Sequence, residues 1–375
     1  MGDFTVPKYR YPAQFEGRER ELLKRIEEVL LRGGYVLGEE VAEFETRLAA
    51  YLGTGHAIGV NSGTDALILT LDALGVGPGD EVVTVANTFH ATAQAVARRG
   101  AVPVYVDCRD DDFLMDLDQL PAAFTERTRA VILVHMFGRA ADVPRAREIC
   151  RDAGVPLVED CAQAIGARSA GVRVGTVSAA GCWSFAPSKN LAAAGDAGAV
   201  STGDEELAER LRLLRHFGQP AQNQHEILGY NSRLDTLQAL VLLHKLDRLD
   251  AWNAARAEVA AAYHARLAHL PLRFQAPGAA PDEHVYHLFQ VRAASESVRD
   301  GLLAHLVASG VDAVVRYPVP LHRQPALSSG GRGNRSGGFP VAEELARQTL
   351  CLPVRPDLDE AELGHVCEAV ERYFR

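Results

Sequence analysis

One lysine occupies a position from which it could act as a nucleophile. Lys189 lies in the stretch WSFAPSKN (183–190), just after an apolar run that predicts a strand, and a glycine-containing run, GDAGAV (195–200), follows it. Ligand crevices of α/β folds form at strand ends. Partial burial or a nearby cation would lower the pKa of this amine and populate its neutral form. Lys189 is therefore a candidate for a Schiff base, although a solvent-exposed lysine beside glycines would look the same.

An acidic residue marks the end of another apolar run. The stretch VPLVEDCAQAIGA (155–167) reaches Asp160 and then enters a loop that contains Gln and Gly. An aspartate paired with the pyridine nitrogen of pyridoxal phosphate keeps that nitrogen protonated, so that the ring can accept electrons from a carbanion. Asp160 fits this role when Lys189 is considered with it. Taken alone, Asp160 would be interpreted as a helix N-cap.

A third stretch could hold phosphate. In GVNSGTDAL (59–67) a predicted strand runs into a Ser-Gly-Thr turn and then a helix. Backbone N–H groups and the helix dipole favour an anion at such a terminus, which makes Gly63 and Thr64 the candidate ligands. The G-K-[ST] ending of a Walker loop is absent, and an ordinary turn before a capped helix would fit the same letters.

Two further stretches are less specific. Phe89, in ANTFHAT (86–92), could cover a flat heterocycle, although an aromatic residue after a strand more often belongs to the core. In GYNSRLDTLQA (229–239), a polar cluster that includes Arg233 precedes a helix, and it could be a cap with a surface ion pair.

The elements that position these residues alternate between strands and amphipathic helices. Short β-rich runs separated by helical stretches are the signature of βαβ units and a largely parallel sheet. We predict an α/β fold whose large domain carries a mixed, mostly parallel seven-stranded sheet between helices. The seven expected strands are 56–60, 81–86, 101–107, 129–137, 155–160, 179–185 and 197–202.

A long Ala- and Leu-rich stretch separates this part from the rest of the chain. Residues 234–270 have helical periodicity and few breakers, which predicts a long connector or two successive helices. We place the domain boundary there, with a large cofactor-binding domain at 1–245 and a smaller C-terminal α+β domain at 246–375. The composition of SSGGRGNRSGG (328–338) predicts a mobile surface loop.

Composition and charge exclude several kinds of protein. The 375 residues are 47% hydrophobic and 23% charged, and 39 basic against 49 acidic residues give a net charge of −10, which argues against binding to nucleic acid or an anionic membrane. The six cysteines have no metal-site spacing and are expected to be free thiols in a reducing cytoplasm. No signal peptide, membrane span or metal site is expected.

Taken together and in this order, the stretches resemble the DegT/DnrJ/EryC1/StrS sugar aminotransferases, which are fold type I pyridoxal-phosphate enzymes with the aspartate aminotransferase fold. The resemblance runs along nearly the whole chain. It is carried by GEEVAEFE (38–45), VNSGTDAL (60–67), EDCAQAIGA (159–167), SFAPSKN (184–190), GDAGAV (195–200), GYNSRLDTLQA (229–239), RYPVPLHRQPAL (316–327) and FPVAEELARQTLCLPV (339–354).

The resemblance implies a role for each matching residue. Lys189 would form the Schiff base with pyridoxal 5'-phosphate and then carry a proton between substrate and cofactor, while Asp160 would bind the pyridine nitrogen. The remaining implied residues are Gln163 for the ring hydroxyl, Phe89 for ring stacking, Gly63, Thr64 and Ser184 for the phosphate, and Asn231 for the phosphate of a neighbouring subunit, which implies a homodimer with active sites at the interface. Tyr317 and His322 could touch the substrate or a glutamate carboxylate, or simply pack the loop.

The implied reaction is a ping-pong transfer of an amino group from L-glutamate to a keto sugar linked to a nucleoside diphosphate. Many relatives carry His or Tyr where this chain has Ala186, which leaves the sugar open, and the GDAG run favours amination at C3. Amination at C4, or of a keto-cyclitol as in aminoglycoside antibiotic pathways, is the alternative. Two more distant alternatives are a sugar dehydratase on the same scaffold and a regulatory protein that binds a sugar nucleotide. In the related dehydratases histidine usually replaces the lysine.

Overall fold

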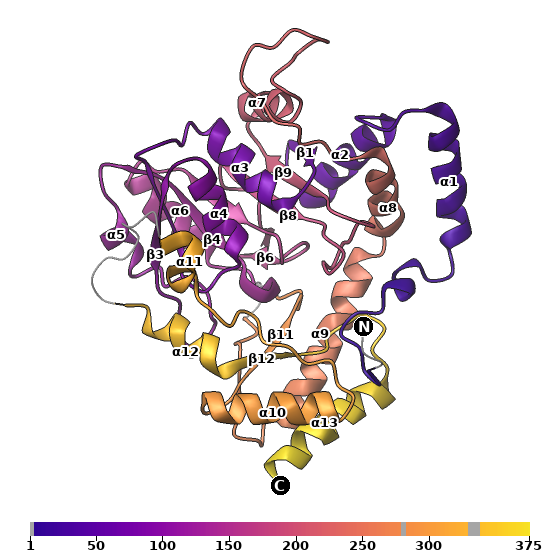
Figure 1. Cartoon of the computed structure of the whole chain (residues 1–375), viewed down its shortest axis with the longest axis vertical. Helices are drawn as coiled ribbons and strands as arrows, with labels where there is room; N and C mark the ends of the chain where they lie inside the picture. The colour runs from indigo at the N-terminus through magenta and orange to yellow at the C-terminus, as the bar shows by residue number, and fades with distance from the viewer. Residues whose placement is uncertain (1–3, 279–282, 329–337) are drawn as a thin grey trace.

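The computed structural model describes residues 4–278, 283–328 and 338–375, and its centre is a seven-stranded sheet (Figure 1). The strand order is β1-β9-β8-β5-β4-β2-β3. The strands are β1 (His56–Val60), β2 (Glu81–Val85), β3 (Val102–Val106), β4 (Thr128–Val134), β5 (Leu157–Asp160), β8 (Ala180–Ser184) and β9 (Gly198–Thr202). Only β9 pairs antiparallel to its neighbours within this sheet. The predicted fold class and all seven predicted strands are confirmed.

The sheet forms because its strands are almost continuous apolar runs. Every residue of β2 and β5 is buried, which is the pattern of strands covered by helices on both faces. The flanking helices include α3 (Gly63–Ala73), α4 (His90–Arg98) and α6 (Val143–Asp152), which make the crossovers between parallel strands. Because β4, β5 and β8 run parallel to one another, their carboxyl ends lie at one edge of the sheet.

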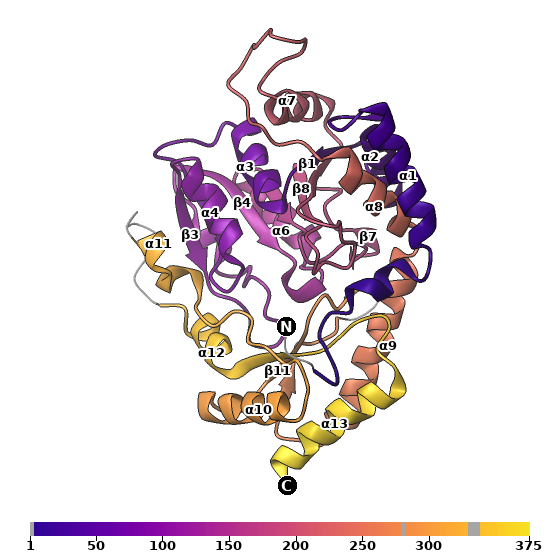
Figure 2. The same ribbon diagram turned by 45° about the vertical axis from the view of Figure 1, so that its right-hand side comes forward.

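The helical stretch at 234–270 is two successive helices, α8 (Thr236–Leu246) and α9 (Leu249–Leu267). After them the chain builds a second layer, visible below the sheet in Figures 1 and 2, in which a three-stranded antiparallel sheet packs with α10 (Glu296–Ala308) and α13 (Glu360–Phe374). Its strands are β10 (Arg273–Phe274), β11 (Phe289–Arg292) and β12 (Thr349–Leu352). A separate apolar cluster lies here, and the division at 245/246 stays a prediction.

The N-terminal segment joins this second layer rather than the central sheet. Val6 is fully buried in the second apolar cluster and forms a parallel bridge with Val311. The backbone N–H of Lys8 donates to the carboxylate of Asp312 at 3.1 Å. These contacts bring Tyr9 to the loop that carries Lys189.

The other elements complete the flanks. They are η1 (Tyr11–Phe15), α1 (Glu19–Arg32), α2 (Glu39–Leu52), α5 (Leu120–Ala123), η2 (Met136–Gly138), β6 (Arg168–Ser169), β7 (Val172–Arg173), α7 (Glu205–Arg215), η3 (Leu321–Arg323), α11 (Pro325–Ser328) and α12 (Pro340–Gln348). The loop expected at 328–338 lies outside the described residues except for its two ends. Within the described ranges, no helix is both long and apolar enough to cross a membrane.

Candidate active site

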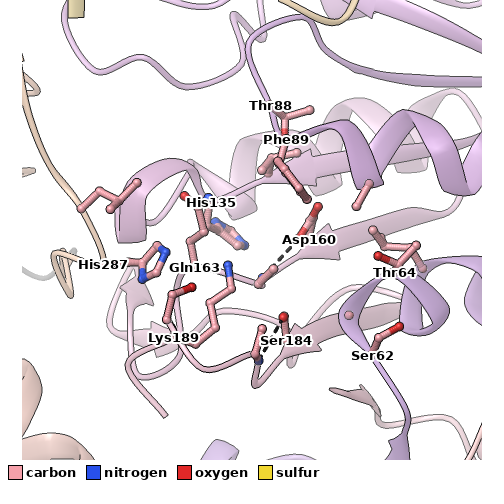
Figure 3. A pocket seen from close by; sticks show the side chains of 18 of the residues that line it. Ser62, Thr64, Thr88, Phe89, His135, Asp160, Gln163, Ser184, Lys189 and His287 are labelled. Carbon is pink, nitrogen blue, oxygen red and sulfur yellow. Dashed lines mark hydrogen bonds between the residues drawn. The ribbon is translucent and has the colours of Figure 1, made fainter. Parts of the chain in front are cut away.

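A cavity of about 290 Å³ opens at the carboxyl edge of the central sheet, between the sheet and the second layer (Figure 3). Asp160 ends β5, His135 follows β4, and Ser184 ends β8, so each strand delivers a polar side chain at its end. The cavity also brings together the other predicted site residues except Asn231 and His322.

Lys189 projects into the cavity from the turn after β8 (Figure 3). The turn is closed by a hydrogen bond from the Lys189 N–H to the carbonyl of Ala186 at 2.9 Å. Burial lowers the pKa of the amine to about 8, with Asp160 opposing the shift and Arg316 adding to it. A substantial fraction of the amine is therefore neutral in mildly alkaline solution, which is the state that attacks a carbonyl carbon.

Asp160 is buried at the end of β5, where two donors hold its carboxylate. The hydroxyl of Thr92 donates to Oδ2 at 2.8 Å, and the backbone N–H of Ala162 donates to Oδ1 at 3.2 Å. Burial nevertheless raises the pKa of Asp160 above its ordinary value. A buried carboxylate in this state gains from a cationic partner, such as a protonated ring nitrogen.

The N-terminus of α3 forms a cradle for an anion. Ser62 caps the helix by accepting a hydrogen bond from the N–H of Asp65 at 3.1 Å. Within the described chain the N–H groups of Gly63 and Thr64 have no protein acceptor, as is usual for the first turn of a helix. A Cβ on Gly63 would lie 2.6 Å from the Cβ of Ser184, so only glycine allows these two segments to approach. The cradle therefore fits a phosphate group.

Gln163, Tyr317 and Phe89 line the part of the cavity between the sheet and the second layer. The amide oxygen of Gln163 accepts from the N–H of Phe137 at 2.6 Å, and its Nε2 donates to the hydroxyl of Tyr317 at 3.0 Å. The ring centroid of Phe89 lies 5.2 Å from that of Tyr317, and Phe89 is 51% exposed. A half-exposed aromatic ring inside a cavity is available to stack on a flat ligand.

Several lining residues were not predicted, although some carried a signal. His135 directly follows β4, which ends at Val134. The predicted strand at 129–137 ran past this residue, so His135 was not recognised as a strand-end residue. Its Nδ1 accepts from the N–H of Ala141 at 3.0 Å, so the proton is on Nε2, which donates to Glu159 at 2.9 Å. Thr88, His287 and Arg316 also line the cavity, but a single Thr, His or Arg in a loop gave no comparable signal.

Two predicted residues lie outside the cavity. Asn231 is exposed, and its backbone pairs with His216 next to the loop that projects beyond α7. His322 is directed to α12, where its Nε2 pairs with Glu343 at 2.9 Å and its side chain is 5% exposed. The contact with Glu343 explains why His322 packs the loop instead of reaching the cavity.

The fold and these side chains define a class of protein. Three features lie together at the carboxyl edge of a mostly parallel sheet: a buried lysine of lowered pKa, an aspartate at the end of the neighbouring strand, and a helix N-terminus that fits phosphate. This is the arrangement of fold type I pyridoxal-phosphate enzymes. The family model of the DegT/DnrJ/EryC1/StrS aminotransferase family matches residues 17–371. The chain belongs to this pyridoxal-phosphate-dependent family.

Individual relatives agree with this assignment over their full length. The chain is 45% identical over 369 residues to dTDP-3-amino-3,4,6-trideoxy-alpha-D-glucose transaminase of Streptomyces venezuelae, covering 98% of this chain and 96% of that protein. It is 40% identical to UDP-N-acetyl-3-dehydro-alpha-D-glucosamine 3-aminotransferase of Acidithiobacillus ferrooxidans, covering 98% of each. The crystal structure of S. venezuelae DesV in complex with a ketimine intermediate superposes with a TM-score of 0.94 at 44% identity, covering 99% of each chain.

Proposed function

We propose that this protein is a pyridoxal-phosphate-dependent aminotransferase that moves an amino group from L-glutamate to the C3 keto group of a nucleoside-diphosphate-linked deoxy sugar. The observation that carries the proposal is the shared cavity of Lys189, Asp160 and the N-terminus of α3. The six free cysteines fit the reducing cytoplasm as its compartment.

The residues present fit the cofactor at each of its ends. Gly63, Thr64 and Ser184 would hold its phosphate, Asp160 its ring nitrogen and Gln163 its ring hydroxyl, while Phe89 would cover the ring. When bound, pyridoxal phosphate supplies an aldehyde for the amino group and a ring that takes up the electrons of the broken C–H bond.

The protein side chains divide the remaining work. Asp160 would place a negative charge beside the ring nitrogen, which favours the protonated form of that nitrogen. With its amine free, Lys189 Nζ would accept the proton from the donor carbon in the first half-reaction. In the second half-reaction Lys189 would deliver a proton to the carbon of the acceptor sugar. Because donor and acceptor substrates use one cavity in turn, the kinetics are ping-pong.

C3 amination is supported by the names of both relatives described above, each of which specifies a 3-amino product or a 3-aminotransferase activity. Ala186 lines the cavity where a larger side chain would narrow it. C4 amination and keto-cyclitol amination remain the alternatives within the same chemistry. The presence of Lys189 in the cavity disfavours a dehydratase.

The homodimer belongs to the same proposal. Asn231 is exposed and lies outside the cavity of its own chain, which fits a role at the cofactor of a neighbouring subunit. Large apolar side chains are exposed on two segments of the described chain. On α1, Leu23, Leu30 and Leu31 are 60%, 50% and 83% exposed, and Leu228, in the projecting loop, is 96% exposed. Such residues are typical of a protein interface rather than of a free surface.

The purified holoenzyme tests the proposal through its own absorbance. Lysine-bound pyridoxal phosphate gives the wild type a visible band, which we expect L-glutamate to convert to the pyridoxamine form. Lys189→Ala should lack the band. A spectrum insensitive to every amino acid would overturn the aminotransferase proposal. Turnover of 4-keto but not 3-keto sugar nucleotide would overturn only the choice of C3.

A further inference from the structure

Arg316 enters the same cavity from the second layer, and no role has been assigned to it above. Two contacts fix its stretch of backbone. The carbonyl of Arg316 accepts a hydrogen bond from the Nε2 of Gln290, on β11, at 2.9 Å. The next residue, Tyr317, is tied to Gln163 at 3.0 Å. The guanidinium is therefore presented to the cavity by a segment that is anchored on both sides.

The guanidinium of Arg316 has no partner in the described part of the chain, although it is half-buried. Other arginines with little exposure are all engaged. Arg256 donates to the carbonyl of Val354 at 2.6 Å, and Arg292 pairs with Glu344 at 2.9 Å. A partly desolvated cation without a counter-ion is costly unless a ligand supplies one.

Arg316 is one of two lysine or arginine cations that line the cavity, as far as the chain is described. Among the described residues that line the cavity, the acids are Asp160 and Asp196, and the lysine and arginine cations are Lys189 and Arg316. Under the proposed function Lys189 is engaged by the cofactor, which leaves Arg316 as the cation available to a substrate anion. Its charge also acts on its surroundings, since it contributes to lowering the pKa of Lys189 after burial, the main cause.

We propose that Arg316 binds the carboxylate of the amino-acid donor. This inference rests on the proposed function and deepens it. The donor carboxylate is attached to the carbon that carries the transferred nitrogen, so it must lie close to Lys189. The diphosphate of a sugar nucleotide is separated from a C3 keto group by the sugar ring. A planar guanidinium can hold a carboxylate with two parallel hydrogen bonds.

The test compares Arg316→Gln and Arg316→Lys with Arg98→Gln, a control at an exposed arginine outside the cavity. Calorimetry on each holoenzyme measures the affinity for glutarate, a dicarboxylate without the reactive amine, and for dTDP. Loss of a hydrogen-bonded charge pair should weaken glutarate binding by roughly 10- to 100-fold in Arg316→Gln, with a smaller loss in Arg316→Lys. Binding of dTDP should be unchanged, and the control should match the wild type.

The kinetic readout separates binding from chemistry. The L-glutamate concentration that half-saturates the spectral change should rise by a similar factor in Arg316→Gln. Equal glutarate affinities in wild type and Arg316→Gln would overturn the inference. So would weakened dTDP binding with glutarate unaffected, because the anion would then be the sugar nucleotide's diphosphate. Failure of the proposed function is distinguishable, since it appears in the wild type as a spectrum that no amino acid changes.

Discussion

The hydroxyl of Thr92 donates a hydrogen bond to the carboxylate of Asp160 at 2.8 Å, and this bond links α4 to the end of β5. Thr92 also lies 3.1 Å from the hydroxyl of Thr88, which lines the cavity. Thr92 lies in the first turn of α4, and Thr88 lies in the segment that leads into this helix. The carboxylate is thus oriented by the helix that follows Phe89, the residue expected to cover the cofactor ring.

Thr92→Val removes this donor while keeping the shape of the side chain. Because a hydrogen bond to the ionised form lowers the pKa of a carboxyl, its loss should raise the pKa of Asp160 further. The acid limb of the pH–kcat profile should then move to higher pH, and kcat should fall by about 10-fold, as for one hydrogen bond to a charged group. Thr92→Ser retains the hydroxyl and should restore both. A Thr92→Val profile that coincides with the wild type would contradict this role.

The lowered pKa of Lys189 predicts how fast the apoenzyme captures pyridoxal phosphate. Only the neutral amine reacts, so the rate constant should rise about tenfold per pH unit below pH 8 and level off above it. Stopped-flow absorbance after mixing apoenzyme with cofactor measures this rate. Lys245 also has a pKa of about 8 through burial but lies outside the cavity, so Lys245→Met should keep the same profile. A rate that rises tenfold per unit up to pH 10 would show an ordinary lysine.

Gly63→Ala should weaken the phosphate cradle. The added Cβ would lie 2.6 Å from the Cβ of Ser184, which forces α3 and the end of β8 apart. We expect cofactor affinity, measured by equilibrium dialysis, to fall on the order of 10- to 100-fold, the cost of about 1–3 kcal/mol of overpacking. Gly77→Ala is the matched control, since nothing lies within 4 Å of its added Cβ. Equal affinities in the two variants would contradict the cradle.

Mixing variants tests whether Asn231 acts across a subunit boundary. Asn231→Ala should bind cofactor weakly and Lys189→Ala should be inactive. If Asn231 serves the partner's site, a mixed dimer should contain one intact site, and the mixture should recover up to about half of wild-type activity per mixed dimer. Activity assays after joint refolding provide the measurement. No recovery, although mixed dimers are detected by native mass spectrometry, would place Asn231 outside any shared site.

The features that the sequence predicted correctly are those that depend on short stretches of chain. The seven strands are apolar runs bounded by glycine, proline and aspartate, and Lys189 and Asp160 follow such runs directly. Contacts between distant segments were not predictable in this way. Three such contacts depend on how helices, strands and loops pack, which no local sequence pattern records. They are the pairing of His322 with Glu343, the hydrogen bond from Thr92 to Asp160, and the approach of Arg316 to Lys189.

The pairing of Val6 with Val311 has a consequence for how the protein is made. The N-terminal segment leaves the ribosome about 300 residues before Val311, its bridge partner, does. At 5–20 residues per second, this interval lasts roughly 15 to 60 s. During that time Val6, which is fully buried in the folded protein, has no partner to pack against. Tyr9 is therefore not yet held beside the loop of Lys189. Assembly of the catalytic pocket is therefore a late event in biosynthesis, because it requires translation of the chain beyond Tyr317.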